Sequence, residues 1–219
     1  MKNTRSILTG TGVACLLAAS MLSAQASALL TVSDGVDPVV SITDNGPGDS
    51  SPLSGVIEWS GSLGGWTYDL NVGETMPFLG NALNPQMYLD FTAISSGAGN
   101  LTITLSDTGF GPIGNSESVE LGAGGTLASG GSVTVSGLIN GSAVVGFGPL
   151  TTSAWNDNAT TSVGSLSSFS LEEEIVLTSG ASGGASSGSA TLVVPEPASM
   201  ALLMLGTSAL WVLRKKRTA

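Results

Sequence analysis

Apolar and polar residues alternate with a period of two through much of the chain. The segment Gln86–Ile94 (QMYLDFTAI) places Met87, Leu89 and Phe91 on one face of an extended backbone, and Asn100–Leu105 (NLTITL) repeats the pattern. Such alternation is typical of strands that bury one face. Further runs of this kind cover 39–43, 55–60, 65–72, 119–121, 132–139, 142–147 and 168–178.

These runs predict an all-β body over residues 29–178, folded as a β-sandwich of about ten short antiparallel strands. No persuasive period of 3.6 residues occurs between the two ends of the chain, so helices are expected only in the terminal segments. A body of roughly 150 residues is long enough to bury one hydrophobic core.

The N-terminal segment, residues 1–28, has the layout of a secretory signal peptide with a helical centre. Lys2 and Arg5 precede an apolar run at Val13–Leu22, and small residues follow. That run has ten residues, fewer than the ~20 that span a bilayer, so a cleaved signal is favoured over a retained anchor.

Two small-x-small sites compete for signal cleavage, one ending at Ala26 and the other at Ala28. Cleavage after Ala28 is favoured, because the residues that follow it, Leu29–Ser33, already alternate like a strand.

The C-terminal segment, residues 195–219, has three parts. Pro195, Glu196 and Pro197 are followed by an apolar run at 198–213 and then by four basic residues, Arg214, Lys215, Lys216 and Arg217. An apolar helix of sixteen residues is about 24 Å long, slightly shorter than a ~30 Å hydrocarbon core. The basic residues would stay on the cytoplasmic side, which predicts a transmembrane helix with everything before Pro195 outside.

This three-part tail resembles the PEP-CTERM sorting signal over about 25 residues. In that family exosortase, a membrane-embedded cysteine transpeptidase, cuts near the Pro-Glu-Pro motif. The cut protein passes from the inner membrane to the cell surface or extracellular matrix of Gram-negative bacteria that make exopolysaccharide. The resemblance implies exosortase as a partner and Pro195, Glu196 and Pro197 as the sorting motif. The alternative is a plain membrane anchor.

Parts of the body also resemble secreted PEP-CTERM proteins to which no activity is attached. The resemblance covers Asn84–Ile94, Gly99–Phe110 and Ser168–Thr178, the last of which resembles the strand that these proteins place just before their tail. Between body and tail, residues 179–194 are rich in Gly and Ser, and we interpret them as a flexible linker with a short strand at most at Thr191–Val194.

Charge is distributed unevenly along the chain. All six basic residues lie at positions 2, 5 and 214–217, whereas all sixteen acidic residues lie between Asp34 and Glu196. The stretch between the basic ends therefore carries a formal charge of −16. Nucleic-acid affinity comes mainly from Lys and Arg that neutralise phosphates, so nucleic-acid binding is excluded.

The residue inventory also excludes most catalysis. The chain has no His, its one Cys is Cys15 in the signal segment, and its body has no Lys or Arg. These absences exclude His-based triads, Schiff-base lysines, phosphate loops and Cys/His zinc sites. Carboxylate-pair glycosidase chemistry is the one enzyme class that the inventory allows. We therefore expect a non-enzymatic protein without a cofactor, calcium excepted.

Candidate calcium ligands lie near the start of the body. Asp34, Asp37, Asp44 and Asp49 supply hard oxygen atoms in a turn-rich stretch, as calcium requires, although their spacing does not match an EF-hand loop.

Two other groups have a functional and a structural interpretation. Glu173 shares parity with the apolar residues of its strand, and a bulge or an edge position is favoured over a catalytic role. Trp59, Trp66 and Tyr68 suit a sugar-stacking platform or core filling, and core filling is favoured.

Together these features predict an exported, non-enzymatic surface or extracellular-matrix protein associated with exopolysaccharide or biofilm. One alternative is a carbohydrate- or calcium-dependent binding module. Another is a glycosidase, which needs two carboxyl groups about 5–9.5 Å apart in a cleft.

Overall fold

The structure is a computed structural model that describes residues 28–114 and 116–195. Every regular element in these residues is a β-strand, which confirms the all-β prediction, and all the strand pairs are antiparallel. Within these residues no helix is long and apolar enough to cross a membrane. The predicted signal peptide, the tail helix, Ala26, Glu196, Pro197 and Arg214–Arg217 lie outside the described residues.

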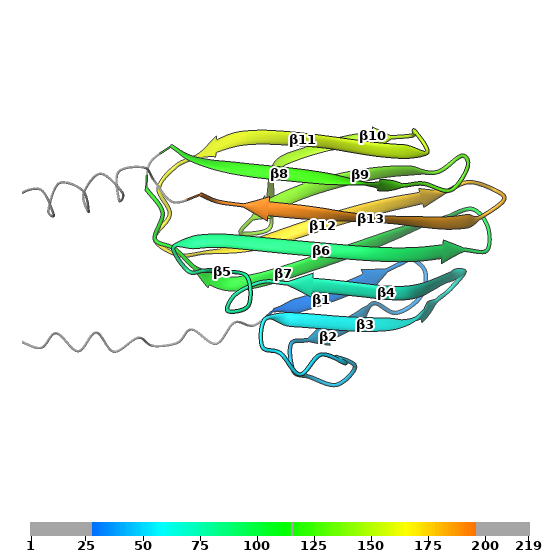
Figure 1. The fold of residues 1–219 in the computed structure, drawn as a ribbon, viewed down its shortest axis with the longest axis horizontal. Helices are drawn as coiled ribbons and strands as arrows, with labels where there is room; N and C mark the ends of the chain where they lie inside the picture. Colours follow the sequence, from blue (N-terminus) through cyan, green and yellow to red (C-terminus); the bar gives the residue numbers. More distant parts are fainter. Residues whose placement is uncertain (1–27, 115, 196–219) are drawn as a thin grey trace, which may run out of the picture.

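The strands form two sheets that pack face to face (Figure 1). Sheet 1 contains, in spatial order, β10 (Ser142–Leu150), β9 (Ser132–Ile139), β12 (Phe169–Ser179), β7 (Gly99–Phe110), β1 (Leu29–Ser33) and β2 (Val40–Thr43). Sheet 2 contains β11 (Ala154–Val163), β8 (Glu117–Thr126), β13 (Gly184–Val193), β6 (Asn84–Ser95), β4 (Trp66–Glu74) and β3 (Val56–Leu63), and the short β5 (Gly80–Asn81) pairs with β6.

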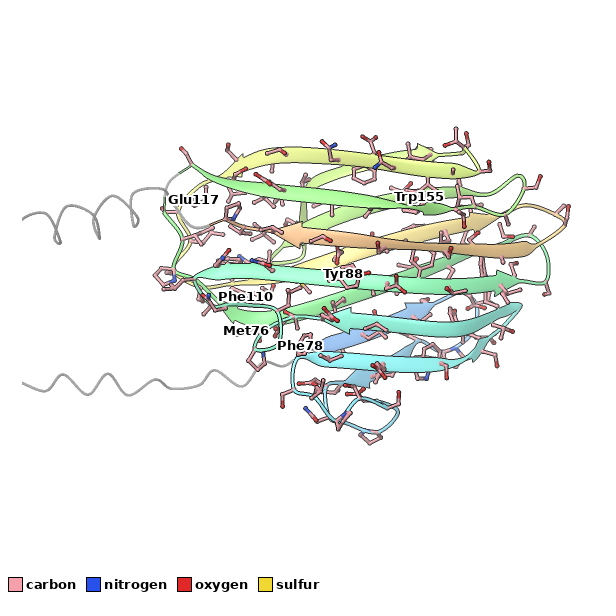
Figure 2. The ribbon with its side chains drawn as sticks, viewed as in Figure 1. Met76, Phe78, Tyr88, Phe110, Glu117 and Trp155 are labelled. Atoms are coloured by element: carbon pink, nitrogen blue, oxygen red, sulfur yellow. The ribbon has the colours of Figure 1, made fainter. Side chains whose placement is uncertain are left out.

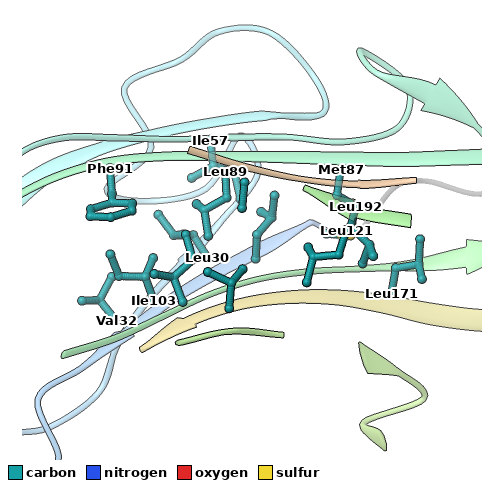
Figure 3. Close-up of a cluster of buried hydrophobic side chains, with 14 of the residues drawn as sticks. Leu30, Val32, Ile57, Met87, Leu89, Phe91, Ile103, Leu121, Leu171 and Leu192 are labelled. Atoms are coloured by element: carbon teal, nitrogen blue, oxygen red, sulfur yellow. The ribbon is translucent and has the colours of Figure 1, made fainter. Parts of the chain in front are cut away.

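The core lies between the inner faces of the two sheets, as the period-two pattern predicts. Met87, Leu89 and Phe91 of β6 are buried, and Ile103 and its same-parity neighbours on β7 face them from the other sheet (Figure 3). Most of the residues between these inward-facing positions on both strands are partly exposed. Because each strand buries alternate residues, the hydrophobic effect determines which face of each sheet turns inward.

The Gly/Ser-rich segment is not a flexible linker, so the linker prediction is wrong. Residues 184–193 form β13, which pairs with β6 on one side and β8 on the other. Its inward residues are small: Ser186 and Ala190 are buried, and a Cβ on Gly188 would stand 2.7 Å from Cζ2 of Trp155. The Trp155 ring already fills the core space beside this strand, so the strand carries small residues and shows no hydrophobic pattern.

Both described ends of the chain lie at one end of the sandwich (Figure 1). β13 runs towards the end where β1 begins, and its last residue, Val193, pairs with Gln86 near the start of β6. Met76, Phe78 and Phe110 lie near this end, which we call the terminal end (Figure 2). The turn between β6 and β7 lies at the opposite, distal end.

Candidate functional site

The four candidate calcium ligands do not form one site. β1 pairs with β2 from Leu29↔Thr43 to Val32↔Val40, so the loop that joins them and the residues that follow β2 lie at opposite ends of the hairpin. Asp34 and Asp37 lie in that loop at the distal end, whereas Asp44 and Asp49 lie beyond β2. The hairpin therefore separates the aspartates into two pairs.

The second pair shapes the loop before β3. Asp49 accepts hydrogen bonds from the backbone N–H groups of Ser51 (2.9 Å) and Glu58 (3.0 Å) on Oδ1, and from Asn45 (2.8 Å) on Oδ2. Asp44 Oδ2 accepts a hydrogen bond from the Gly55 N–H at 2.9 Å. These carboxylates satisfy backbone donors, as Asp side chains commonly do in turns.

The first pair faces a common point in the β3–β4 turn. A Cβ on Gly64, whose φ is 54°, would collide with Oδ2 of Asp34 and stand 3.0 Å from Oδ2 of Asp37. Hydrogen bonds from the backbone N–H groups of Val36 and Asp37 lower the pKa of Asp34. Asp34 is therefore ionised at neutral pH and adds a negative charge at this position.

A cleft of about 320 Å³ opens beside this pair at the distal end. The polar side chains that line it are those of Asp34, Asp37, Ser95, Ser96 and Asn100. Trp66 and glycine-rich turns also contribute to the lining. The Ser96 N–H and hydroxyl both donate to the Gly65 carbonyl oxygen, at 2.9 and 3.0 Å. These bonds tie the β6–β7 turn to the β3–β4 turn, so the walls of the cleft are connected.

No cluster of three or more His, Cys, Asp or Glu residues placed to hold a metal occurs among the described residues. Calcium takes six to eight oxygen ligands, of which the Asp34–Asp37 pair would supply only a part. Calcium binding therefore stays a prediction, restricted to the distal cleft.

The aromatic residues support the core-filling interpretation. Trp66 and Tyr68 are 4 % and 2 % exposed, and the Trp59 ring packs against Tyr68 with centroids 5.1 Å apart. Burial, with a smaller contribution from the charge of Asp34, raises the pKa of Tyr68. Trp66 and Tyr68 lie in the core between the sheets, and Trp59 is partly buried against it, so the three rings do not form an exposed stacking platform.

Glu173 lies neither at an edge nor in a bulge, so that prediction is wrong. β12 is a central strand, and Glu173 pairs in regular register with Leu105 and Gly137. Its side chain is fully buried, and neither carboxyl oxygen has a hydrogen-bond partner. Burial raises the pKa of Glu173 well above its usual value. It has the inward parity of its strand, and the adjacent Gly137 has no side chain to oppose it.

Sequence reasoning missed a second buried carboxyl group. Asp107 of β7 is fully buried and accepts hydrogen bonds from Thr75 Oγ1 at 2.9 Å and from the Thr108 N–H at 2.6 Å. Thr75 follows β4 of sheet 2, so this hydrogen bond joins the two sheets. The only signal in the sequence is that Asp107 continues the inward parity of Leu101, Ile103 and Leu105.

The last strand leads directly into the C-terminal signal. The Val194 N–H donates to the Pro85 carbonyl oxygen at 3.0 Å, Val194 is fully buried, and Pro195 is half-buried. Residues 193–217 match the PEP-CTERM protein-sorting motif. The chain carries a PEP-CTERM sorting signal. This match confirms the resemblance of the tail, and it implies that exosortase processes the chain during export through the membrane.

The sorting signal begins on the last residue of β13, so the match overlaps the folded body. No characterised protein with a significant sequence match to the chain was found.

Proposed function

We propose that this chain is an exported, non-enzymatic protein of the cell surface or extracellular matrix, released from the inner membrane by exosortase and associated with exopolysaccharide. The observation that carries the proposal is the PEP-CTERM signal joined directly to a β-sandwich. A signal of this kind addresses whatever folded unit precedes it, and here that unit is the body 28–195.

The carboxyl groups of the body support a non-enzymatic role. A carboxylate-pair glycosidase needs one carboxyl group with a raised pKa as the acid and a second carboxylate across the same cleft. The pKa of Asp34 in the cleft is lowered. Burial raises the pKa of Glu173, which lies in the core, and of Asp90, which lies on the outward side of β6, and neither residue lines the cleft. The carboxyl groups with a raised pKa and the carboxyl group with a lowered pKa thus lie in different places.

Fractionation of wild-type and exosortase-deficient cells tests the sorting proposal. We expect a shortened protein outside wild-type cells and a full-length, membrane-retained protein in the deficient strain. A variant with Pro195, Glu196 and Pro197 all changed to Ala should behave in wild-type cells as the wild-type chain does in the deficient strain. Pro38→Ala, in an exposed loop, is the matched control. Normal shortening of the triple variant would show that the tail is a plain anchor.

A second candidate function is glycan binding in the distal cleft. The carboxylates of Asp34 and Asp37 can accept hydrogen bonds from sugar hydroxyl groups, and Ser96 and Asn100 supply further polar groups. Because Lys and Arg are absent between positions 6 and 213, the body has no cation for an anionic sugar. The cleft therefore favours a neutral glycan, or an anionic glycan joined through calcium.

Retention on the native polysaccharide, with and without calcium, tests this second candidate. Asp37→Asn should weaken retention, since it removes a charge from the cleft while Asp34 still accepts the hydrogen bonds of the loop. Glu120→Gln, exposed on the outer face of β8, is the charge-matched control. If millimolar calcium raises the Tm no more than sodium at equal ionic strength, the calcium-dependent form fails. Equal retention of the two variants would show that the distal cleft does not bind the polysaccharide.

A further inference from the structure

The first and last parts of the body are anchored in the same core. Ala28 and Val194 are each fully buried and belong to the hydrophobic cluster between the sheets. The Ala28 carbonyl oxygen accepts a hydrogen bond from the Asp44 N–H at 3.0 Å, and the Val194 N–H donates to the Pro85 carbonyl oxygen at 3.0 Å. Each residue thus contributes a buried side chain and a backbone hydrogen bond at the terminal end.

We propose that these two residues set the limits of the mature chain. Signal peptidase hydrolyses the Ala26–Ser27 bond, so that the mature protein begins at Ser27. Exosortase breaks a bond on the C-terminal side of Pro195, so that the mature protein keeps all of β13. The inference rests on the proposed export and adds the two processing positions.

The fold decides between the two signal-cleavage sites that the sequence offers. Cleavage after Ala28 would remove a buried side chain and the acceptor of the Asp44 N–H. It would also place a charged ammonium group on Leu29, whose backbone pairs with Thr43 and Ser106 in the middle of three strands. Cleavage after Ala26 keeps all of these contacts and places the ammonium group two residues before Leu29, the first residue of β1.

The same reasoning sets the C-terminal limit. β13 pairs with β6 from Gly184↔Ser95 to Val193↔Gln86 and with β8 from Ser187↔Thr126 to Val193↔Glu120. A cut before Val193 would take hydrogen bonds from two neighbours at once, and a cut directly after Val194 would place a carboxylate on a fully buried residue. Pro195, which is half-buried, is the first position where a new charged end can reach water.

Because β13 ends at Val193, the segment between the folded body and the apolar run is short. Only residues 194–197 separate the last strand from the apolar run, and four extended residues span about 13 Å. The terminal end of the sandwich is therefore close to the membrane until the bond breaks. The distal cleft is lined by residues 95–100 of the β6–β7 turn, which lies at the opposite end of the sandwich.

Both steps break one peptide bond each. In the first step, water adds to the Ala26 carbonyl carbon, and the products carry a carboxylate on Ala26 and an ammonium group on Ser27. In the second step, the acyl group of the new C-terminal residue passes through the cysteine of exosortase to water, or to an amine or hydroxyl group of an acceptor. The apolar segment leaves with a free amino group.

Mass spectrometry of the exported protein from the native host tests both limits. We expect an N-terminal peptide that begins at Ser27 and a C-terminal peptide that ends at Pro195 or beyond. A first residue of Leu29 overturns the N-terminal limit, and an end at Val194 or earlier overturns the C-terminal limit. A tail that stays intact in wild-type cells overturns processing by exosortase and with it the C-terminal limit, while the first residue still decides the N-terminal limit.

The Ala24→Tyr variant sharpens the N-terminal test. Ala24 occupies the −3 position of the Ala26 site only, whereas the Ala28 site uses Ala26 and Ala28, and both positions need small residues. We expect the variant to accumulate as precursor, or to begin at Leu29 with a Tm about 2–4 °C lower. An unchanged N-terminus and Tm would show that natural cleavage does not use Ala26. Gln25→Tyr, between the two small positions, is the control and should be cut as the wild type is.

Discussion

β12 and β13 occupy comparable places and are built in opposite ways. Each is a central strand that pairs with a neighbour on both sides, β12 in sheet 1 and β13 in sheet 2. The inward side of β12 carries large apolar residues and one carboxyl group. The inward side of β13 carries Ser186, Gly188 and Ala190 before its first large residue, Leu192. The side chains of β12 fill the core space beside that strand, whereas the core space beside β13 is filled by side chains of other strands.

The filling of β13 comes from one row across sheet 2. Trp155, Gly125, Gly188 and Phe91 are successive partners on β11, β8, β13 and β6. A Cβ on Gly125 or Gly188 would stand 2.9 or 2.7 Å from Cζ2 of Trp155, and one on Gly188 would also stand 3.2 Å from Cε1 of Phe91. The two rings therefore cover two glycines. Trp155 is labelled in Figure 2. Burial here is a property of the row, because aromatic side chains can pack over glycine on a neighbouring strand.

The largest effect should follow from removing the ring that covers β13. Trp155→Ala should lower the free energy of unfolding by about 3–5 kcal/mol, since it empties the space over two glycines. Urea unfolding followed by far-UV circular dichroism measures the change. Trp59→Ala is the control with a smaller expected loss, because Trp59 is only partly buried. A loss of less than 1 kcal/mol for Trp155→Ala would mean that the row does not depend on Trp155.

The reverse change should also destabilise the row. Gly188→Val adds atoms where Trp155, Phe91 and the Gly124 carbonyl oxygen already stand, the last at 2.8 Å from the added Cβ. Overpacking of this kind costs about 1–3 kcal/mol. Thr191→Val introduces the same residue on the outward side of β13 and should change the urea midpoint little. Equal midpoints for the two variants would contradict the tight packing of the row.

The same contrast explains what the sequence predicts and what it does not. β6, β7 and β12 alternate large apolar and polar residues, so their existence and inward faces were predictable. β13 has the same parity, but Ser, Gly and Ala carry almost no hydrophobic signal, and composition alone indicates a linker. Its burial depends on Trp155, which comes from another strand and could not be assigned to this row without the register.

The candidate site shows the same limit. The acidic, turn-rich stretch predicts one calcium site with four aspartates, and only Asp34 and Asp37 of these line the cleft. Four aspartates close in sequence were divided by the β1–β2 hairpin, because its two ends are a strand length apart. The rest of the cleft comes from turns 64–65 and 95–100, which become neighbours only when sheet 2 forms.

β12 differs from β13 also in its buried carboxyl group, whose replacement should stabilise the protein. Glu173→Leu removes two buried oxygen atoms without hydrogen-bond partners and should raise the free energy of unfolding at pH 7 by about 1–3 kcal/mol. Urea unfolding measures this change, and Glu174→Leu, on the outward side of the same strand, is the matched control. A loss of stability in the Glu173 variant would show that the carboxyl group has a partner in solution.

The pH dependence gives an independent test of Glu173. Because its pKa in the folded state is raised, the folded protein binds the proton more tightly than the unfolded chain does. Stability from this group is therefore fully present below the unfolded pKa of about 4.3 and falls as pH rises towards the folded pKa. Urea unfolding between pH 4 and pH 8 should show this fall in the wild type, and a smaller fall in Glu173→Gln. Parallel curves would contradict the assignment.

The smallest effect concerns the outward sides of the two strands. Glu172 and Glu174 project outward from β12 beside hydroxyl-bearing and apolar neighbours such as Ser106, Thr104 and Leu138, whereas β13 has no charged residue on its outward side. Because Lys and Arg are absent between positions 6 and 213, the two carboxylates repel each other and the rest of the acidic body.

Changing Glu172 and Glu174 to Gln should therefore raise the free energy of unfolding at 10 mM salt by a few tenths of a kcal/mol, the range expected of like charges on one strand face. The gain should vanish at 1 M salt, where charges more than about 3 Å apart are screened. A double change of Ser187 and Ser189 to Gln on β13 is the control, since it alters side-chain size without altering charge. Urea midpoints at the two salt concentrations measure both variants. If the double Gln variant of β12 keeps the salt dependence of the wild type, the repulsion that limits stability lies elsewhere, and the Asp34–Asp37 pair at the distal end is the next place to neutralise.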